Sequence, residues 1–166
     1  TGYSATMVGF PYDDLVRWRG PYPPEDFARQ FEKVAEGWTE GLVELETAQA
    51  LVPEELRQAA AADLRVAQAA QFHFASVANQ VRFVIARDKL AASQDEEETT
   101  KLREELNAIL DREIELARRM FALSSADSRL GYEASNHYFY TPLDLVEKII
   151  NCEDLKSSLP SPKRGR

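Results

Sequence analysis

The sequence has few of the residues and segments on which several classes of protein depend. Its single cysteine, Cys152, allows no disulfide within the chain, which excludes the disulfide framework of a small secreted scaffold. No uninterrupted apolar run reaches the roughly 18 residues of a membrane-spanning helix, and no segment resembles a signal peptide. We therefore predict a soluble chain that has no membrane partner.

Familiar catalytic and cofactor motifs are also missing. The chain has no Gly-x-Ser-x-Gly motif, no phosphate-binding glycine loop and no cysteine pair. His73, one of two histidines, lies in a helical pattern, but Ala70 stands where a helical di-iron site needs a glutamate. The sequence thus predicts no cofactor and no metal site, with His73 as a structural or surface residue.

The charge balance excludes one further class of partner. The chain has 20 Lys and Arg residues and 28 Asp and Glu residues, so its formal net charge is −8 at pH 7. Such a chain lacks the attraction to phosphate that supplies most nonspecific binding to nucleic acid. We therefore expect no nucleic-acid partner. Because 44% of the 166 residues are hydrophobic, we also expect one folded domain with a continuous core.

Apolar residues recur at three- and four-residue steps in long segments, which is typical of amphipathic helices. Pro24 and Pro53 suit first helical positions, and Asp95 and Thr141 suit N-caps. The apolar stripe of the first long helix consists of Phe27, Phe31, Val34, Trp38, Leu42 and Leu45, and that of the second consists of Phe74, Val77, Val81, Val84 and Ile85. The stripe of the third long helix consists of Leu102, Leu106, Ile109, Leu116, Met120 and Leu123, and that of the last helix consists of Leu143, Val146, Ile149 and Ile150.

These patterns predict an all-α fold, a bundle of three long helices plus a shorter C-terminal helix. An irregular, aromatic and proline-rich N-terminal segment spans residues 1–23, with at most one or two helical turns at 13–18. The bundle domain spans residues 24–156, and residues 157–166 form a basic tail that we expect to be disordered. Gly37 and Gly41 lie one turn apart and indicate either a close approach of another helix or a bend.

The densest polar cluster lies in the connection that precedes the last helix. It combines carboxylate, guanidinium, imidazole, amide and phenol groups, which can hydrogen-bond a hydroxyl-rich ligand while aromatic faces stack on it. The same groups can instead fasten a long connection to the bundle. The candidate ligand-binding residues are Asp127, Arg129, Tyr132, Glu133, Asn136, His137, Tyr138 and Tyr140.

The segment 127–140 (DSRLGYEASNHYFY), with LDLVEK at 143–148 and NC at 151–152, resembles a stretch near the C-terminus of large bacterial glycoside-hydrolase-like multidomain proteins. The segment 18–24 (WRGPYPP) and the pairs at 37–38 and 41–42 resemble the same region, so the similarity spans most of the chain. The resemblance implies a helical domain after a barrel-type catalytic domain that holds the acid and base. It also implies a periplasmic or extracellular location, and it assigns no catalytic residue here.

The favoured prediction is therefore a noncatalytic helical accessory domain of a carbohydrate-active protein. It would buttress a catalytic domain of the same longer chain and lend the 127–140 connection to a sugar-binding cleft. Two alternatives stay open. One is a stand-alone helical module for protein–protein interaction, and the other is an autonomous hydrolase that uses Glu133 and His137 as acid and base.

Overall fold

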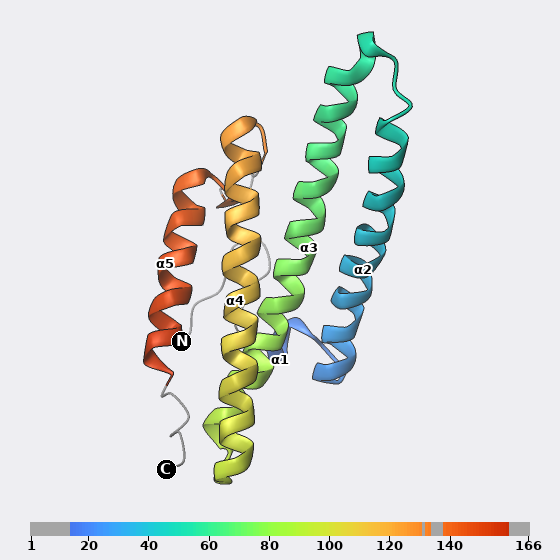
Figure 1. Ribbon diagram of the computed structural model, residues 1–166. Helices are drawn as coiled ribbons and strands as arrows, with labels where there is room; N and C mark the ends of the chain where they lie inside the picture. Colours follow the sequence, from blue (N-terminus) through green and yellow to red (C-terminus); the bar gives the residue numbers. More distant parts are fainter. Residues whose placement is uncertain (1–13, 131, 134–137, 160–166) are drawn as a thin grey trace.

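The computed structural model describes residues 14–130, 132–133 and 138–159 (Figure 1). Over these residues the chain is predominantly helical, and the predicted all-α bundle of three long helices and a shorter C-terminal helix is confirmed. In chain order the elements are α1 (Leu15–Trp18), α2 (Pro24–Gln49), the 3₁₀ turn η1 (Glu54–Leu56), α3 (Arg57–Ala92), α4 (Glu96–Ala126), the short strands β1 (Tyr132–Glu133) and β2 (Tyr138–Phe139), and α5 (Pro142–Ser158).

Local side-chain hydrogen bonds begin two of the helices where the sequence predicts. At the start of α4, Asp95 Oδ1 accepts hydrogen bonds from the backbone N–H groups of Glu97 (2.8 Å) and Glu98 (3.0 Å). At the start of α5, Thr141 and Asp144 form a capping box in which each side chain accepts from the other's backbone N–H. These bonds satisfy amide groups that have no partner within a helix, so each helix begins at a defined residue.

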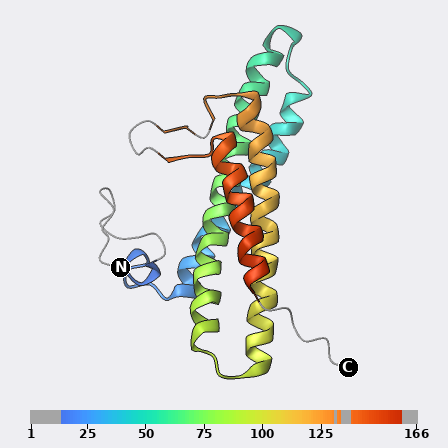
Figure 2. The ribbon, with the colours of Figure 1, turned by 90° about the vertical axis from the view of Figure 1, so that its left-hand side faces the viewer.

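The long helices run up and down in sequence order. α3 packs against α2 on one side and against α4 on the other, and α4 also packs against α5 (Figure 1). Seen from the side, α5 lies over α3 and α4 (Figure 2), and Lys148 of α5 reaches Ser76 of α3. The three helices α3, α4 and α5 therefore share a core, while α2 is added to the far side of α3.

Several apolar clusters hold these layers together, and two of them join α3 to its neighbours on either side. One lies between α1, α2 and α3 and contains the fully buried Ala28 and Val81, with Trp18 and Phe31 packed against it. The other joins α3, α4 and α5 and consists of Phe72, Ala117, Met120, Leu130 and Leu145. Because Leu130 lies beyond the end of α4, the second cluster also fixes the start of the connection to α5.

The buried face of α5 differs from the predicted one. Leu145 and Cys152 are buried and Ile149 is half-buried, at positions spaced i, i+4 and i+7. Of the residues predicted to form the buried edge, Leu143 is 76% exposed, and Val146 and Ile150 are also exposed. The prediction was wrong for these three because the last helix carries two apolar stripes, and only contact with α3 and α4 decides which one is covered.

The α2–α3 hairpin extends beyond α4 and α5 at the end that carries the 50–56 turn (Figure 1). In this distal part α2 has only α3 to pack on, so several of its apolar side chains stay partly exposed. Within the described part of the chain, no helix combines the length and apolar character that crossing a bilayer requires. α5 continues to Ser158, and residues 160–166 of the predicted tail lie outside the described residues.

Candidate functional site

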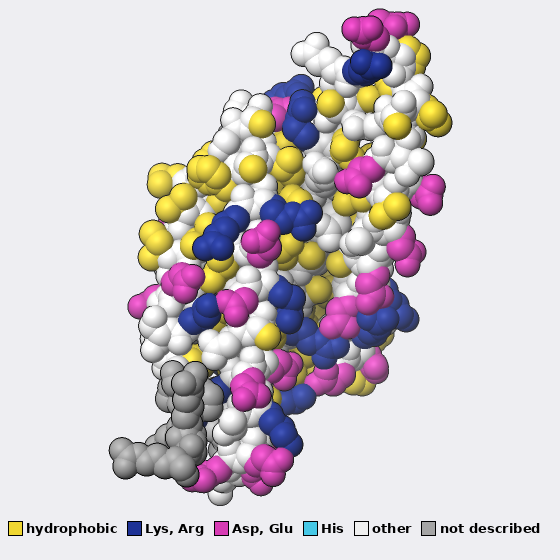
Figure 3. Space-filling view, viewed as in Figure 1, with side chains coloured by type: hydrophobic (Ala, Val, Ile, Leu, Met, Phe, Trp, Pro, Cys, Tyr) yellow, Lys and Arg dark blue, Asp and Glu magenta, His cyan; other side chains and the backbone are white. Residues whose placement is uncertain are grey.

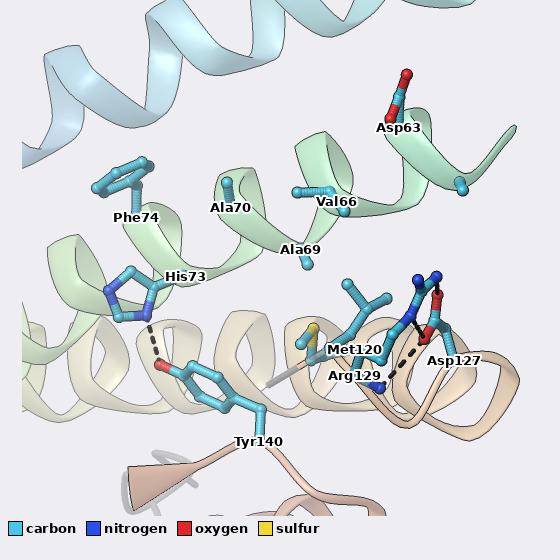
Figure 4. Close-up of a pocket in the computed structure, with 12 residues that line it drawn as sticks. Asp63, Val66, Ala69, Ala70, His73, Phe74, Met120, Asp127, Arg129 and Tyr140 are labelled. Atoms are coloured by element: carbon cyan, nitrogen blue, oxygen red, sulfur yellow. Dashed lines mark hydrogen bonds and ion pairs between the residues drawn. The ribbon is translucent and has the colours of Figure 1, made fainter. Parts of the chain in front are cut away.

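A cavity of about 540 Å³ opens between the first half of α3, the end of α4 and the connection to α5. Figure 4 shows residues of all three segments facing this space. Its apolar wall comes mainly from α3, and its polar groups lie at the two ends. The lining residues are Ala62, Asp63, Val66, Ala69, Ala70, His73, Phe74, Met120, Asp127, Arg129, Leu130 and Tyr140.

His73 and Tyr140 close one end of the cavity. Their side chains point toward each other in Figure 4, with His73 Nδ1 2.9 Å from the Tyr140 hydroxyl oxygen. The two rings meet edge to face, with centroids 5.6 Å apart. Burial, and secondarily the positive charge of Lys148, lower the pKa of His73 below its usual value, because both disfavour a charged imidazole. At neutral pH His73 is therefore an uncharged hydrogen-bonding partner of Tyr140.

Asp127 and Arg129 form the other polar end. Asp127 Oδ1 accepts hydrogen bonds from the backbone N–H of Arg129 (3.1 Å) and from its Nε (2.8 Å), and Oδ2 accepts from Nη2 (2.6 Å). These hydrogen bonds hold the pKa of the Asp127 carboxyl far below its usual range. The backbone N–H of Asp127 also bonds the Leu123 carbonyl, so the pair is anchored to the end of α4.

A buried polar cluster lies directly behind His73 and Tyr140. Glu113 of α4 forms an ion pair with Lys148 of α5 and accepts hydrogen bonds from Ser76 Oγ (2.5 Å) and Asn79 Nδ2 (2.9 Å) of α3. Lys148 Nζ also donates to Ser76 Oγ at 2.9 Å and lies 5.5 Å from the centre of the Tyr140 ring. The cluster links α3, α4 and α5 by hydrogen bonds and an ion pair, and its Lys148 contacts the ring of Tyr140.

The structure brings three of the eight predicted site residues into the cavity, namely Asp127, Arg129 and Tyr140. In the β1–β2 ladder Tyr132 pairs with Phe139, and Glu133 pairs with Tyr138. This pairing defines the backbone positions of these residues and not the positions of their side chains. Asn136 and His137 lie outside the described residues.

Sequence reasoning missed the contribution of α3 to this site. His73 was predicted as a structural or surface residue, yet it lines the cavity and contacts Tyr140, which lies 67 residues further along the chain. Glu113 and Lys148 were likewise not singled out as a pair. Helical spacing reveals neighbours within one helix, so contacts between distant helices leave no local signal. A polar residue inside an apolar stripe, such as Glu113 beside Ile114, was the one available hint.

The side chains of the cavity can donate and accept several hydrogen bonds around an apolar surface. The cavity combines a phenol, an imidazole, a guanidinium group and carboxylates with an apolar floor, a mixture that suits hydroxyl-rich ligands with apolar faces. Among the described residues, no carboxylate contacts His73 to orient it as a general base, and Asp127 is held by Arg129. No three His, Cys, Asp or Glu side chains of the described ranges cluster so that they could hold a metal ion.

Comparison of the chain with protein-family models, with curated proteins and with solved structures gives no match.

Proposed function

We propose that the chain is a noncatalytic helical accessory domain of a carbohydrate-active protein, in which the cavity beside the 127–140 connection holds part of a sugar ligand. The catalytic acid and base would reside in another domain of the same longer protein. The proposal rests in part on the resemblance of the 127–140 segment to glycoside-hydrolase-like proteins.

One observation carries the proposal. The polar side chains that line the cavity come from α3 and from the 127–140 connection, and four of the five form two pairs that hold one another in place. Tyr140 is held by His73, and Arg129 is held by Asp127. Groups fixed in this way can present hydrogen-bond donors and acceptors to a ligand at little entropic cost. They are not arranged as a free acid and base on either side of a reacting bond.

The first experiment measures binding by the isolated chain. A panel of neutral and acidic oligosaccharides is titrated into the chain by calorimetry, and the best ligand is then titrated into Tyr140→Phe. Losing the phenolic hydroxyl should weaken binding about fivefold to tenfold, which corresponds to roughly 1 kcal/mol for one hydrogen bond. Tyr22→Phe is the matched control, because Tyr22 is exposed before α2 and does not line the cavity.

The second experiment measures turnover. The same purified chain is incubated with a panel of nitrophenyl glycosides, and release of nitrophenol is followed. We expect no release above that of buffer. Hydrolysis by the isolated chain would refute the noncatalytic part of the proposal, while a panel without any binder, or equal affinity of Tyr140→Phe and the unaltered chain, would refute the sugar-binding part.

The alternative of a protein-interaction module has an observation of its own. Leu143, Val146 and Ile150 form an exposed apolar stripe along α5, on the side away from the core. Apolar stripes of this kind often mark surfaces that pack against other proteins or domains. Replacing Leu143 and Ile150 by serine separates the two functions, since a pure interaction module loses its partner while sugar binding by the cavity is unchanged.

The autonomous hydrolase with Glu133 and His137 remains the third possibility. Neither side chain belongs to the described part of the structure. Replacing either residue by its uncharged counterpart, Glu133→Gln or His137→Gln, should abolish activity without changing helicity if this alternative holds. In our proposal both variants have the same zero turnover as the unaltered chain.

A further inference from the structure

The apolar stripe of α2 is only partly covered by α3. Val34 is 41% exposed and Trp38 is 37% exposed, although both belong to the stripe that packs on α3. Beside them lies a hollow of about 500 Å³, which runs along α2 and is bounded on the α3 side by Ala67. Trp38 also stacks on Phe74 of α3, with ring centroids 5.7 Å apart, so the hollow lies next to the sugar cavity and is separate from it.

Two glycines leave space in this hollow for the backbone of another helix. Gly37 and Gly41 line it, and a Cβ atom added at either position would meet no atom within 4 Å. Each glycine weakens α2 by about 1 kcal/mol relative to alanine, yet no described part of this chain makes the close approach that they permit. The hollow therefore has room for an additional helix backbone along α2.

The charge around the hollow is acidic. Lys33 belongs to the lining of the hollow, but between residues 33 and 65 the hairpin carries seven Asp or Glu against one Lys and two Arg, so its net charge is negative. Glu40 and Glu44 follow Gly37 at i+3 and i+7, so they lie on the same side of α2 as the glycines. Figure 3 shows acidic side chains at the tip of the hairpin and along its α2 edge. A partner that brings positive charge is attracted to this rim, whereas a second copy of the same hairpin is repelled.

We propose that the α2 hollow is a docking site for an amphipathic helix of another protein or domain, with apolar residues facing Trp38 and Lys or Arg facing Glu40 and Glu44. The stretch from Val34 to Leu45 is about three helical turns long, which matches apolar anchors at i, i+3 or i+4, and i+7 of the bound helix. This site goes beyond the proposed sugar cavity and uses different residues.

The experiment uses fluorine NMR on the full chain labelled with 5-fluorotryptophan. The chain has two tryptophans, and Trp18 packs with Phe27 and Phe31 away from the hollow, so it serves as an internal control. The probe is a helical Leu/Lys peptide of ~18 residues, or about five turns. We expect the Trp38 resonance to shift on titration while the Trp18 resonance stays in place. The same peptide with Glu in place of Lys should bind at least about tenfold more weakly.

Two variants test the site itself. Gly41→Leu fills the hollow and should weaken peptide binding about tenfold, whereas Val43→Leu places a leucine at an exposed position of α2 that does not line the hollow and should leave binding unchanged. Glu40→Gln with Glu44→Gln should weaken binding about threefold and reduce its dependence on salt. Because these glutamates are exposed, this second variant tests the proposal even if Gly41→Leu fails to fold.

Several outcomes would overturn the docking site. These are an unmoved Trp38 resonance, equal binding of the Lys and Glu peptides, unchanged binding by Gly41→Leu in a folded chain, and self-association of the chain through this face. We expect Tyr140→Phe, which alters the sugar cavity, to bind the peptide as well as the unaltered chain does. Titrating the peptide into this variant therefore tests the docking site independently of the sugar cavity.

Discussion

Replacing Lys148 by methionine tests the buried polar cluster at the centre of the bundle. The substitution keeps the length and apolar stem of the side chain, but it leaves the carboxylate of Glu113 without its ion-pair partner. The Glu113 side chain is 11% exposed and that of Lys148 is 31% exposed, so the remaining charge is poorly reached by water. The hydrogen bonds from Ser76 and Asn79 stay in place and compensate only part of the loss.

The expected cost follows from the degree of burial. Removing one partner of a fully buried pair costs about 3–5 kcal/mol, and because Lys148 is partly open to solvent we expect about 2–3 kcal/mol here. In a domain of this size that loss lowers the melting temperature by about 5–10 °C. Lys148→Met with Glu113→Leu removes both charges and should recover most of the lost stability, because no uncompensated charge remains in the core.

Urea unfolding followed by circular dichroism measures these free energies in a double-mutant cycle of four chains: the unaltered chain, Lys148→Met, Glu113→Leu and the double variant. Lys148→Arg is the matched control and should lie closer to the unaltered chain than Lys148→Met. The reasoning is refuted if Lys148→Met costs less than about 0.5 kcal/mol, or if the double variant is no more stable than Lys148→Met alone.

Three further substitutions test other parts of the structure. The lowered pKa of His73 means that the unfolded chain takes up this proton more readily than the folded chain, so stability falls as the pH is lowered from about 7.5 to about 5.5; urea unfolding should show a smaller fall for His73→Gln than for the unaltered chain. Gly41→Ala should raise the free energy of unfolding by about 0.5–1 kcal/mol, because the added methyl group meets open space in a helix; a loss of stability would show that the position is strained. Thr141→Ala removes the capping box of α5 and should cost about 1 kcal/mol, and no measurable change in the urea midpoint would contradict that role.

The parts of the fold that depend on local sequence could be predicted. Asp95 and Thr141 were expected as N-caps, and both accept the capping hydrogen bonds in the structure. Capping depends on residues only two or three positions apart, so it can be recognised in the sequence itself. The long helices follow from the same kind of information, since their apolar residues repeat with the helical period.

The parts that depend on contacts between distant helices could not be predicted. α5 carries two apolar stripes, and the sequence pattern favoured Leu143 and Ile150 where the structure buries Leu145 and Cys152. The pairing of His73 with Tyr140 depends on how α3 lies against the connection to α5, and nothing near either residue indicates it. Spacing along one helix contains no information about the register of another.

One NMR experiment tests the central claim that this chain binds a sugar without cleaving it. Proton spectra of an oligosaccharide mixture are recorded over time with the isolated chain, and saturation is transferred from protein to ligand. Our account predicts saturation transfer to at least one oligosaccharide, reduced in Tyr140→Phe, and an unchanged set of anomeric signals. New anomeric signals that grow with time, or the absence of saturation transfer to every sugar in the mixture, would contradict it.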